Sequence, residues 1–193
     1  MMGASTRAQA LRAAAAGGAA VGVAAWLRPQ SSAGKESAAQ DVKILNFLLV
    51  LEQAQAAFYD AAVRGGALQG DLLTFARVVA PQEHDHVQFI RKKLGTQAGP
   101  PPKLDFGRAT SDPRRFTAAA IDLEEATAAA YIGQGANLTR EAMADAARIV
   151  AVEARHAAWI RDLAGQAPAP RAADPPRTAD DVLTELRQKG YLR

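Results

Sequence analysis

Glu153-Ala154-Arg155-His156 stands in the middle of the last long stretch of the chain that has helical periodicity. A glutamate and a histidine three residues apart lie on the same side of one helical turn, where both side chains can reach one metal ion. The pattern is weak evidence alone, because Glu-x-x-His also occurs as a solvated surface pair. Here it has a second copy, Glu83-His84-Asp85-His86, and in both copies an aromatic residue, an isoleucine and an arginine follow at the same positions.

A second repeated pattern precedes each copy of this motif. Leu51-Glu52 is followed by Tyr59, and Leu123-Glu124 is followed by Tyr131, so a tyrosine stands seven positions after the glutamate both times. From this glutamate to the glutamate of the next motif there are 31 residues in the first half and 29 in the second. The sequence therefore contains one pair of helices twice.

Composition favours an all-α protein of one domain. The chain has 193 residues, which is enough to bury a full core. It is rich in alanine, and its glycines and prolines gather outside the periodic segments. With no cysteine, a disulfide framework, a thiolate zinc site and a cysteine nucleophile are excluded. The net charge is only +3 and no dense Lys/Arg stripe occurs, so we expect no nucleic-acid partner.

Residues 1–40 have the features of an export signal. Arg7 and Arg12 precede an uncharged run of alanine, glycine and valine at 13–26, and a polar segment follows. The apolar run is too short and too weakly hydrophobic for a stable membrane span. The start resembles a bacterial twin-arginine signal, with Ala8 where the second arginine belongs. We expect export to the periplasm, cell envelope or medium; a disordered tail on a cytoplasmic protein is the alternative.

Four long helices are expected in residues 41–165, the predicted main domain. The first should cover 41–64 and the second 72–94, with a kink or a fresh start at Pro81, which removes a backbone donor. Caps are predicted at Asp71, Asp112 and Thr139 for the second, third and fourth helices. Residues 166–193 are predicted to form a Pro-rich spacer and a short helix capped by Thr178.

The segment between the second and third helices, residues 95–112, has 18 residues and several prolines. A helix of ~20 residues is about 30 Å long, and an extended chain covers up to ~3.3–3.6 Å per residue. The segment is therefore long enough to cross from one end of a bundle to the other, and we expect such a crossover.

Four amphipathic helices that each offer an inward glutamate, two of them with a histidine, supply the ligands of a dinuclear carboxylate site. Carboxylates are hard ligands that can bridge two ions, and imidazole adds a neutral ligand for each. Without cations, four carboxylates in an apolar core are strongly disfavoured. The expected metal ligands are Glu52, Glu83, His86, Glu124, Glu153 and His156.

The order of these motifs resembles the ferritin-like superfamily, the di-iron and di-manganese carboxylate bundles, over about residues 41–165. The resemblance implies an antiparallel four-helix bundle with a long crossover between its second and third helices. It also implies that Glu52 and Glu124 are terminal ligands, that Glu83 and Glu153 bridge the ions, and that each histidine binds one ion.

The repeat helps to assign the ligand glutamate of the third helix and the tyrosines that accompany the ligands. Glu124 and Glu125 are adjacent on one helix, and the repeat selects Glu124 because only it has a tyrosine seven residues later. Tyr59 and Tyr131 are candidates for hydrogen bonds to the ligand carboxylates, and the other interpretation makes them ordinary core tyrosines. His84 lies about 100° round the helix from Glu83, which favours a surface position.

The leading functional hypothesis is a protein with two iron ions, or alternatively manganese, that couples metal redox change to O2 or peroxide. Ferroxidase, catalase-like and oxygenase reactions use the same ligands, and the first two are favoured. The alternative is a non-catalytic helical bundle of the cell envelope, protective or structural, whose metal only stabilises the fold. A cage-forming iron store is a third, less favoured hypothesis. The sequence is compatible with an oligomer.

Overall fold

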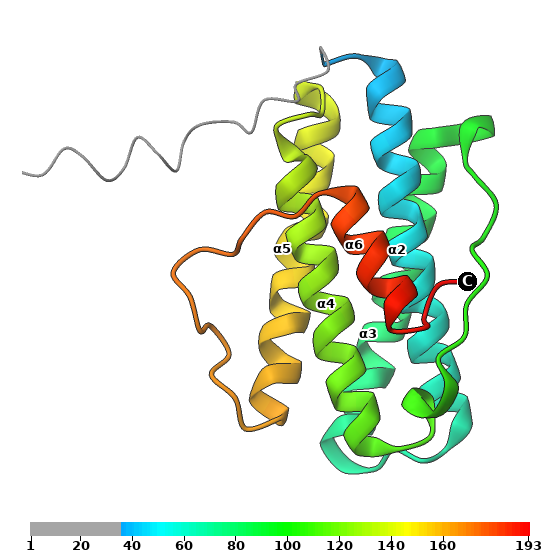
Figure 1. The fold of residues 1–193 in the computed structure, drawn as a ribbon, viewed down its shortest axis with the longest axis vertical. Coiled ribbons are helices and arrows are strands. Elements are labelled where there is room, and N and C mark those ends of the chain that lie inside the picture. The colour runs from blue at the N-terminus through cyan, green and yellow to red at the C-terminus, as the bar shows by residue number, and fades with distance from the viewer. Residues whose placement is uncertain (1–35) are drawn as a thin grey trace, which may run out of the picture. The chain divides into compact units, whose positions relative to one another are not determined.

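Four long helices form the body of the protein in the computed structural model, which describes residues 36–193. They are α2 (Ala38–Gly65), α3 (Gly70–Leu94), α4 (Pro113–Gly135) and α5 (Arg140–Leu163). In Figure 1, α2 and α5 run in one direction and α3 and α4 in the other. The connection from α3 to α4 runs along the bundle from one end to the other (Figure 1). The predicted all-α bundle with a long crossover is therefore confirmed.

Residues 1–35 hold most of the expected export signal and lie outside the described residues. Among the helices of residues 36–193, none is both long enough and apolar enough to span a membrane.

Side-chain caps set most of the helix starts. Asp112 accepts a hydrogen bond from Arg115 N, and Thr139 and Thr178 cap α5 and the next helix in the same way, as predicted. The predicted cap at Asp71 is wrong: α3 begins at Gly70, two residues earlier than predicted, and Gln69 is its N-cap. Asp71 lies in the first turn instead, where its charge still favours the positive end of the helix dipole.

Pro81 does not interrupt α3, so the fresh start considered there does not occur. A proline inside a helix costs about 3 kcal/mol through its missing N–H and its clash with the preceding turn. Val79, Ala80 and Glu83 around it are all buried. Packing of this face against the bundle offsets the local cost, because tertiary contacts supply most of the stability of helices in proteins.

The chain after α5 returns across the bundle. Its short helix, α6 (Ala179–Gln188), is the predicted C-terminal helix and packs on α4. Arg177 N donates a hydrogen bond to Ala129 O of α4 at 3.0 Å. Beyond α6, Leu192 forms an antiparallel bridge with Leu104 of the crossover. The C-terminal segment is therefore attached at both ends.

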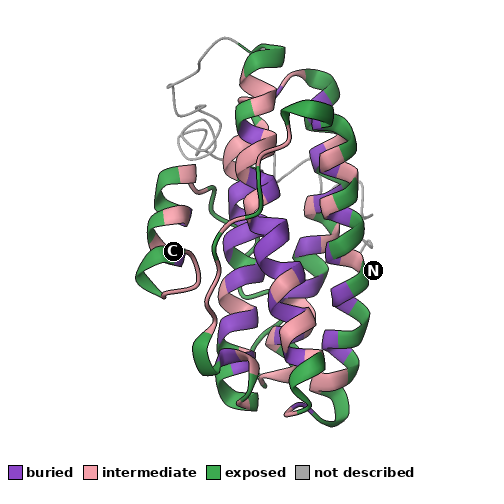
Figure 2. Ribbon diagram, turned by 90° about the vertical axis from the view of Figure 1, so that its right-hand side faces the viewer, coloured by how far each residue is buried: buried purple, intermediate pink, exposed green. Residues whose placement is uncertain are grey.

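Each long helix turns one buried face inward, as Figure 2 shows in purple. An aromatic cluster fills part of this core: Phe58 stacks on Phe116 with ring centroids 5.2 Å apart, and Tyr59 and Phe75 meet edge to face. The middle of the core is different, because it contains charged side chains from all four helices.

Candidate metal centre

The six residues predicted as metal ligands come together inside the bundle. Glu52 comes from α2, Glu83 and His86 from α3, Glu124 from α4, and Glu153 and His156 from α5. All four glutamates are 0% exposed, and the histidines are 8% and 3% exposed. Charged groups with no contact to water need a compensating charge or proton at this place.

Glu124 and its neighbour Glu125 lie on different faces of α4. The Glu124 side chain is fully buried in the cluster, whereas Glu125 is half exposed and pairs with Arg161 of α5. Consecutive positions of a helix are about 100° apart, so only one of the two side chains can point into the bundle.

Two overlapping sets of four ligand atoms exist in the described part of the chain. In each set, one atom from every residue lies within 4.8 Å of the others. The sets share Glu83 and Glu153, which is the arrangement expected of two carboxylates that bridge a pair of ions. The first set is Glu52, Glu83, His86 and Glu153, and the second is Glu83, Glu124, Glu153 and His156.

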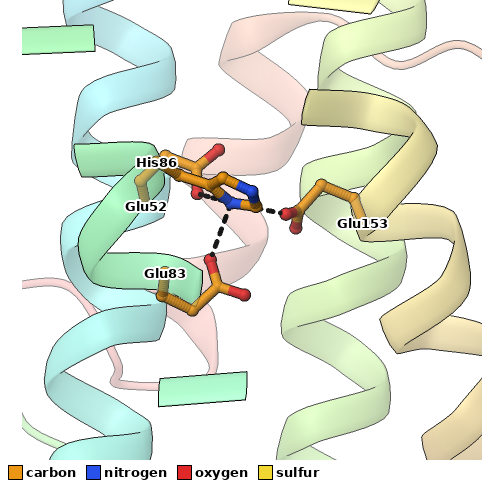
Figure 3. Close-up of side chains that lie close together, drawn as sticks. All are labelled: Glu52, Glu83, His86 and Glu153. Carbon is orange, nitrogen blue, oxygen red and sulfur yellow. Dashed lines mark hydrogen bonds and ion pairs between the residues drawn. The ribbon is translucent and has the colours of Figure 1, made fainter. Parts of the chain in front are cut away.

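Nδ1 of His86 is the centre of the first set (Figure 3). It lies 3.2 Å from Glu52 Oε2, 3.4 Å from Glu83 Oε2 and 3.0 Å from Glu153 Oε1. Three carboxylates on three helices therefore converge on one imidazole nitrogen.

His156 plays the same part in the second set. Its Nδ1 lies 3.0 Å from Glu83 Oε1 and 3.5 Å from Glu124 Oε2. Its other ring nitrogen, Nε2, lies 2.7 Å from Gln82 Oε1. Because an amide oxygen only accepts, Nε2 carries a hydrogen here, and Nδ1 is the nitrogen that faces the carboxylates.

Several buried atoms at this point have no hydrogen-bond partner, although they lie close together. They include both oxygens of Glu83, Glu124 Oε2, Glu153 Oε1 and His156 Nδ1. A lone pair that faces carboxylate oxygens at ion-pair distance is repelled unless a cation or a proton lies between them. Carboxylate oxygens and imidazole nitrogens are ligands for divalent metal ions. The residues therefore fit a pair of such cations.

The cluster also perturbs its own protonation. Burial raises the pKa of Glu52 to about 7, and it raises the pKa of Glu83 and Glu153 as well, with mutual repulsion adding to the effect. Burial alone lowers the pKa of His86, but the carboxylates of Glu153, Glu52 and Glu83 close to its Nδ1 raise it to about 12. In the absence of metal, protons therefore take the place of the missing positive charge.

Each tyrosine of the repeat forms a hydrogen bond with the glutamate that belongs to the other copy of the repeat. Tyr59 of α2 donates its hydroxyl hydrogen to Glu124 of α4, and Tyr131 of α4 donates to Glu52 Oε1 of α2 at 2.5 Å. Burial raises the pKa of both tyrosines well above the ordinary value, and the nearby carboxylates add to the rise. Both hydroxyls therefore stay protonated and act as donors. Of the two interpretations, hydrogen bonding to the carboxylates is the one that the contacts support.

Three polar residues around the cluster were not predicted from the sequence. Gln55 Nε2 donates to Glu153 Oε2 at 3.0 Å, and Thr127 Oγ donates to Gln55 Oε1 at 2.8 Å. Gln55 and Thr127 each stand three positions after a repeat glutamate, so the repeat itself contained their signal. Gln82, the partner of His156, had no such signal, because Val152 occupies the matching position in the other copy.

Fold and cluster together define a class of protein: a four-helix bundle with glutamates and histidines buried at its centre. A model of the ferritin-like domain family matches residues 40–166, which is more than half of the chain. The chain belongs to the ferritin-like domain family. Comparison with curated proteins gives no match. The predicted resemblance is thus confirmed at the level of the family.

Proposed function

We propose that this protein binds two redox-active metal ions, iron or alternatively manganese, and couples their oxidation and reduction to O2 or peroxide. The observation that carries the proposal is the group of unpartnered oxygen and nitrogen atoms on Glu83, Glu124, Glu153 and His156. Two divalent cations balance four carboxylates, and they satisfy the lone pairs that the protein leaves without donors.

In this proposal each of the six side chains has a separate task. Glu52 and Glu124 would each hold one ion, Glu83 and Glu153 would be shared by both ions, and His86 and His156 would each bind one ion through Nδ1. Tyr59 and Tyr131 hold one oxygen of each terminal glutamate, which leaves the other oxygen directed at the cluster. When bound, two such ions supply electrons and Lewis acidity for the reduction of an oxidant.

The protein's own contribution is orientation and the exclusion of water. All four carboxylates are out of contact with solvent, so their attraction for cations is screened far less than on a surface. Gln55 fixes Glu153, and it is itself held by Thr127. Ligands whose positions are set before binding lose less conformational freedom when an ion arrives.

The test begins with the full chain loaded anaerobically with Fe²⁺ or Mn²⁺. Bound metal is counted after desalting, and the consumption of O2 and of hydrogen peroxide is then followed separately. We expect stoichiometric metal and consumption of one oxidant; which oxidant is consumed separates the ferroxidase-like from the catalase-like reaction. Glu153→Gln should abolish both results. Glu141→Gln changes an exposed glutamate of the same helix and should abolish neither.

Two results would contradict the proposal in different ways. Stoichiometric metal without consumption of either oxidant would leave the non-catalytic bundle, in which metal only stabilises the fold. Protein that binds no metal under these conditions would remove both hypotheses.

Export is a second part of the proposal, and it is supported by the sequence alone. Arg7, Arg12 and the uncharged run at 13–26 support it. N-terminal sequencing of the protein from cell fractions tests it: a shortened chain outside the cytoplasm is expected, and an intact Met1 on protein confined to the cytoplasm would contradict it.

A further inference from the structure

The two histidines of the cluster differ in one contact: His156 has a hydrogen-bond partner that has no counterpart at His86. His156 Nε2 donates to Gln82 Oε1 at 2.7 Å, across from α5 to α3. His86 makes its polar contacts through Nδ1, and within residues 36–193 no side chain accepts a hydrogen bond from its Nε2. The residue of α5 that matches Gln82 in the repeat is Val152, which has no acceptor.

This contact fixes three properties of His156. It selects the tautomer whose Nδ1 is free, it holds the ring at one angle, and it strengthens Nδ1 as an electron-pair donor. His86 must gain all three when an ion binds, and its side chain is also more open to solvent, at 11% against 4% for His156. An imidazole that is already oriented loses less freedom on binding.

We propose that Gln82 makes the two metal positions unequal, so that the position at His156 binds its ion more tightly and fills first. Gln82 acts as a positioning residue through His156. The inference rests on the proposed function, since it presupposes two bound ions. It adds an order of filling that neither the repeat nor the six ligands contain.

The experiment is an equilibrium titration of the metal-free full chain with Co²⁺ alone, followed by the visible absorption of the bound ion. Wild type should show two phases, and His156→Ala should remove the tighter one while His86→Ala removes the weaker one. Gln82→Leu should weaken the tighter phase by roughly 10–100-fold, the range for partners of ligating histidines. The weaker phase should be unchanged, so the dissociation constants of the two phases should become more similar.

Three further variants separate positioning from a general effect on the fold. Gln82→Glu keeps an acceptor oxygen and should restore the tight phase, which a loss of packing would not explain. Gln88→Leu removes an exposed glutamine of the same helix and should change neither phase. Gln82→Ala repeats the test should the leucine variant fail to fold.

The results that would overturn the inference differ from those that would overturn the proposed function. Two phases in wild type that Gln82→Leu and Gln82→Ala leave unchanged, or a change confined to the weaker phase, would contradict the inference alone. A tight phase that Gln82→Glu fails to restore would do the same. Wild-type protein that binds no Co²⁺ would contradict the proposed function, and the inference with it.

Discussion

Tyr59 and Tyr131 show how single residues carry the symmetry of the repeat into the site. Tyr59 donates to Glu124 and Tyr131 donates to Glu52, so the buried glutamate of each half is held by a tyrosine of the other half. A hydroxyl that donates to a buried carboxylate satisfies one oxygen and leaves the second for a cation. The two halves are therefore linked by these buried hydrogen bonds as well as by the packing of their helices.

Tyr59→Phe should weaken metal binding without removing the site. The substitution keeps the ring in the core but leaves one buried oxygen of Glu124 without its donor. We expect the affinity of one of the two ions to fall roughly 10-fold or more, as for other partners of ligands. Calorimetric titration with Mn²⁺ measures it. Tyr191→Phe, on the C-terminal tail away from the cluster, is the control, and equal affinities for all three proteins would contradict the role of Tyr59.

At the scale of the helices, much could be predicted from the sequence because the repeat and the apolar periodicity are local properties of the chain. They indicated four helices, the crossover and the choice of Glu124 over Glu125. Asp71 was misplaced because the helix start depends on the Gly70 turn, whose φ of 55° no side-chain pattern reveals. Gln82 could not be found because its role depends on which residue of α5 lies opposite.

Attachment of the C-terminal segment depends on Gly133 of α4. A Cβ atom added there would lie 2.0 Å from the backbone oxygen of Arg177, which cannot move without breaking the hydrogen bond from Arg177 N to Ala129 O. Gly133→Ala should therefore lower the free energy of unfolding by about 1–3 kcal/mol, the usual range for overpacking. Urea denaturation measures the change.

Gly135→Ala is the matched control for this prediction. A Cβ at that position meets no atom within 4 Å, so the protein should be unchanged or up to about 1 kcal/mol more stable. A Gly133→Ala protein as stable as the Gly135→Ala protein would show that the close contact does not hold the segment.

For the molecule as a whole, the buried cluster makes stability depend on what neutralises its charge. Protons and metal ions compete for the same lone pairs, so one should replace the other as pH rises. The pKa of Glu52 is raised by burial from 4.5 to about 7, and the carboxylates raise the pKa of His86 from 6.5 to about 12. The folded protein without metal therefore holds protons that the unfolded chain releases.

The sign of the pH effect follows from these raised pKa values. A raised pKa contributes stability that is complete below the unfolded value and is lost as pH rises through the folded value. The Tm of the metal-free protein should therefore fall between pH 5 and pH 8, while the metal-loaded protein changes much less. Calorimetry with and without a chelator measures both. Glu52→Gln removes one titrating group and should flatten the slope, and a metal-free Tm that rises over this interval would contradict the account.

The number of metal ions bound per chain tests the central claim most directly. Wild type, Glu124→Ala and Glu125→Ala should be loaded with Fe²⁺ anaerobically, desalted and analysed for iron by mass spectrometry. The account predicts two ions in wild type, two in Glu125→Ala, whose side chain lies on the surface, and a sharp loss in Glu124→Ala. Unchanged iron in Glu124→Ala, or a loss confined to Glu125→Ala, would contradict it.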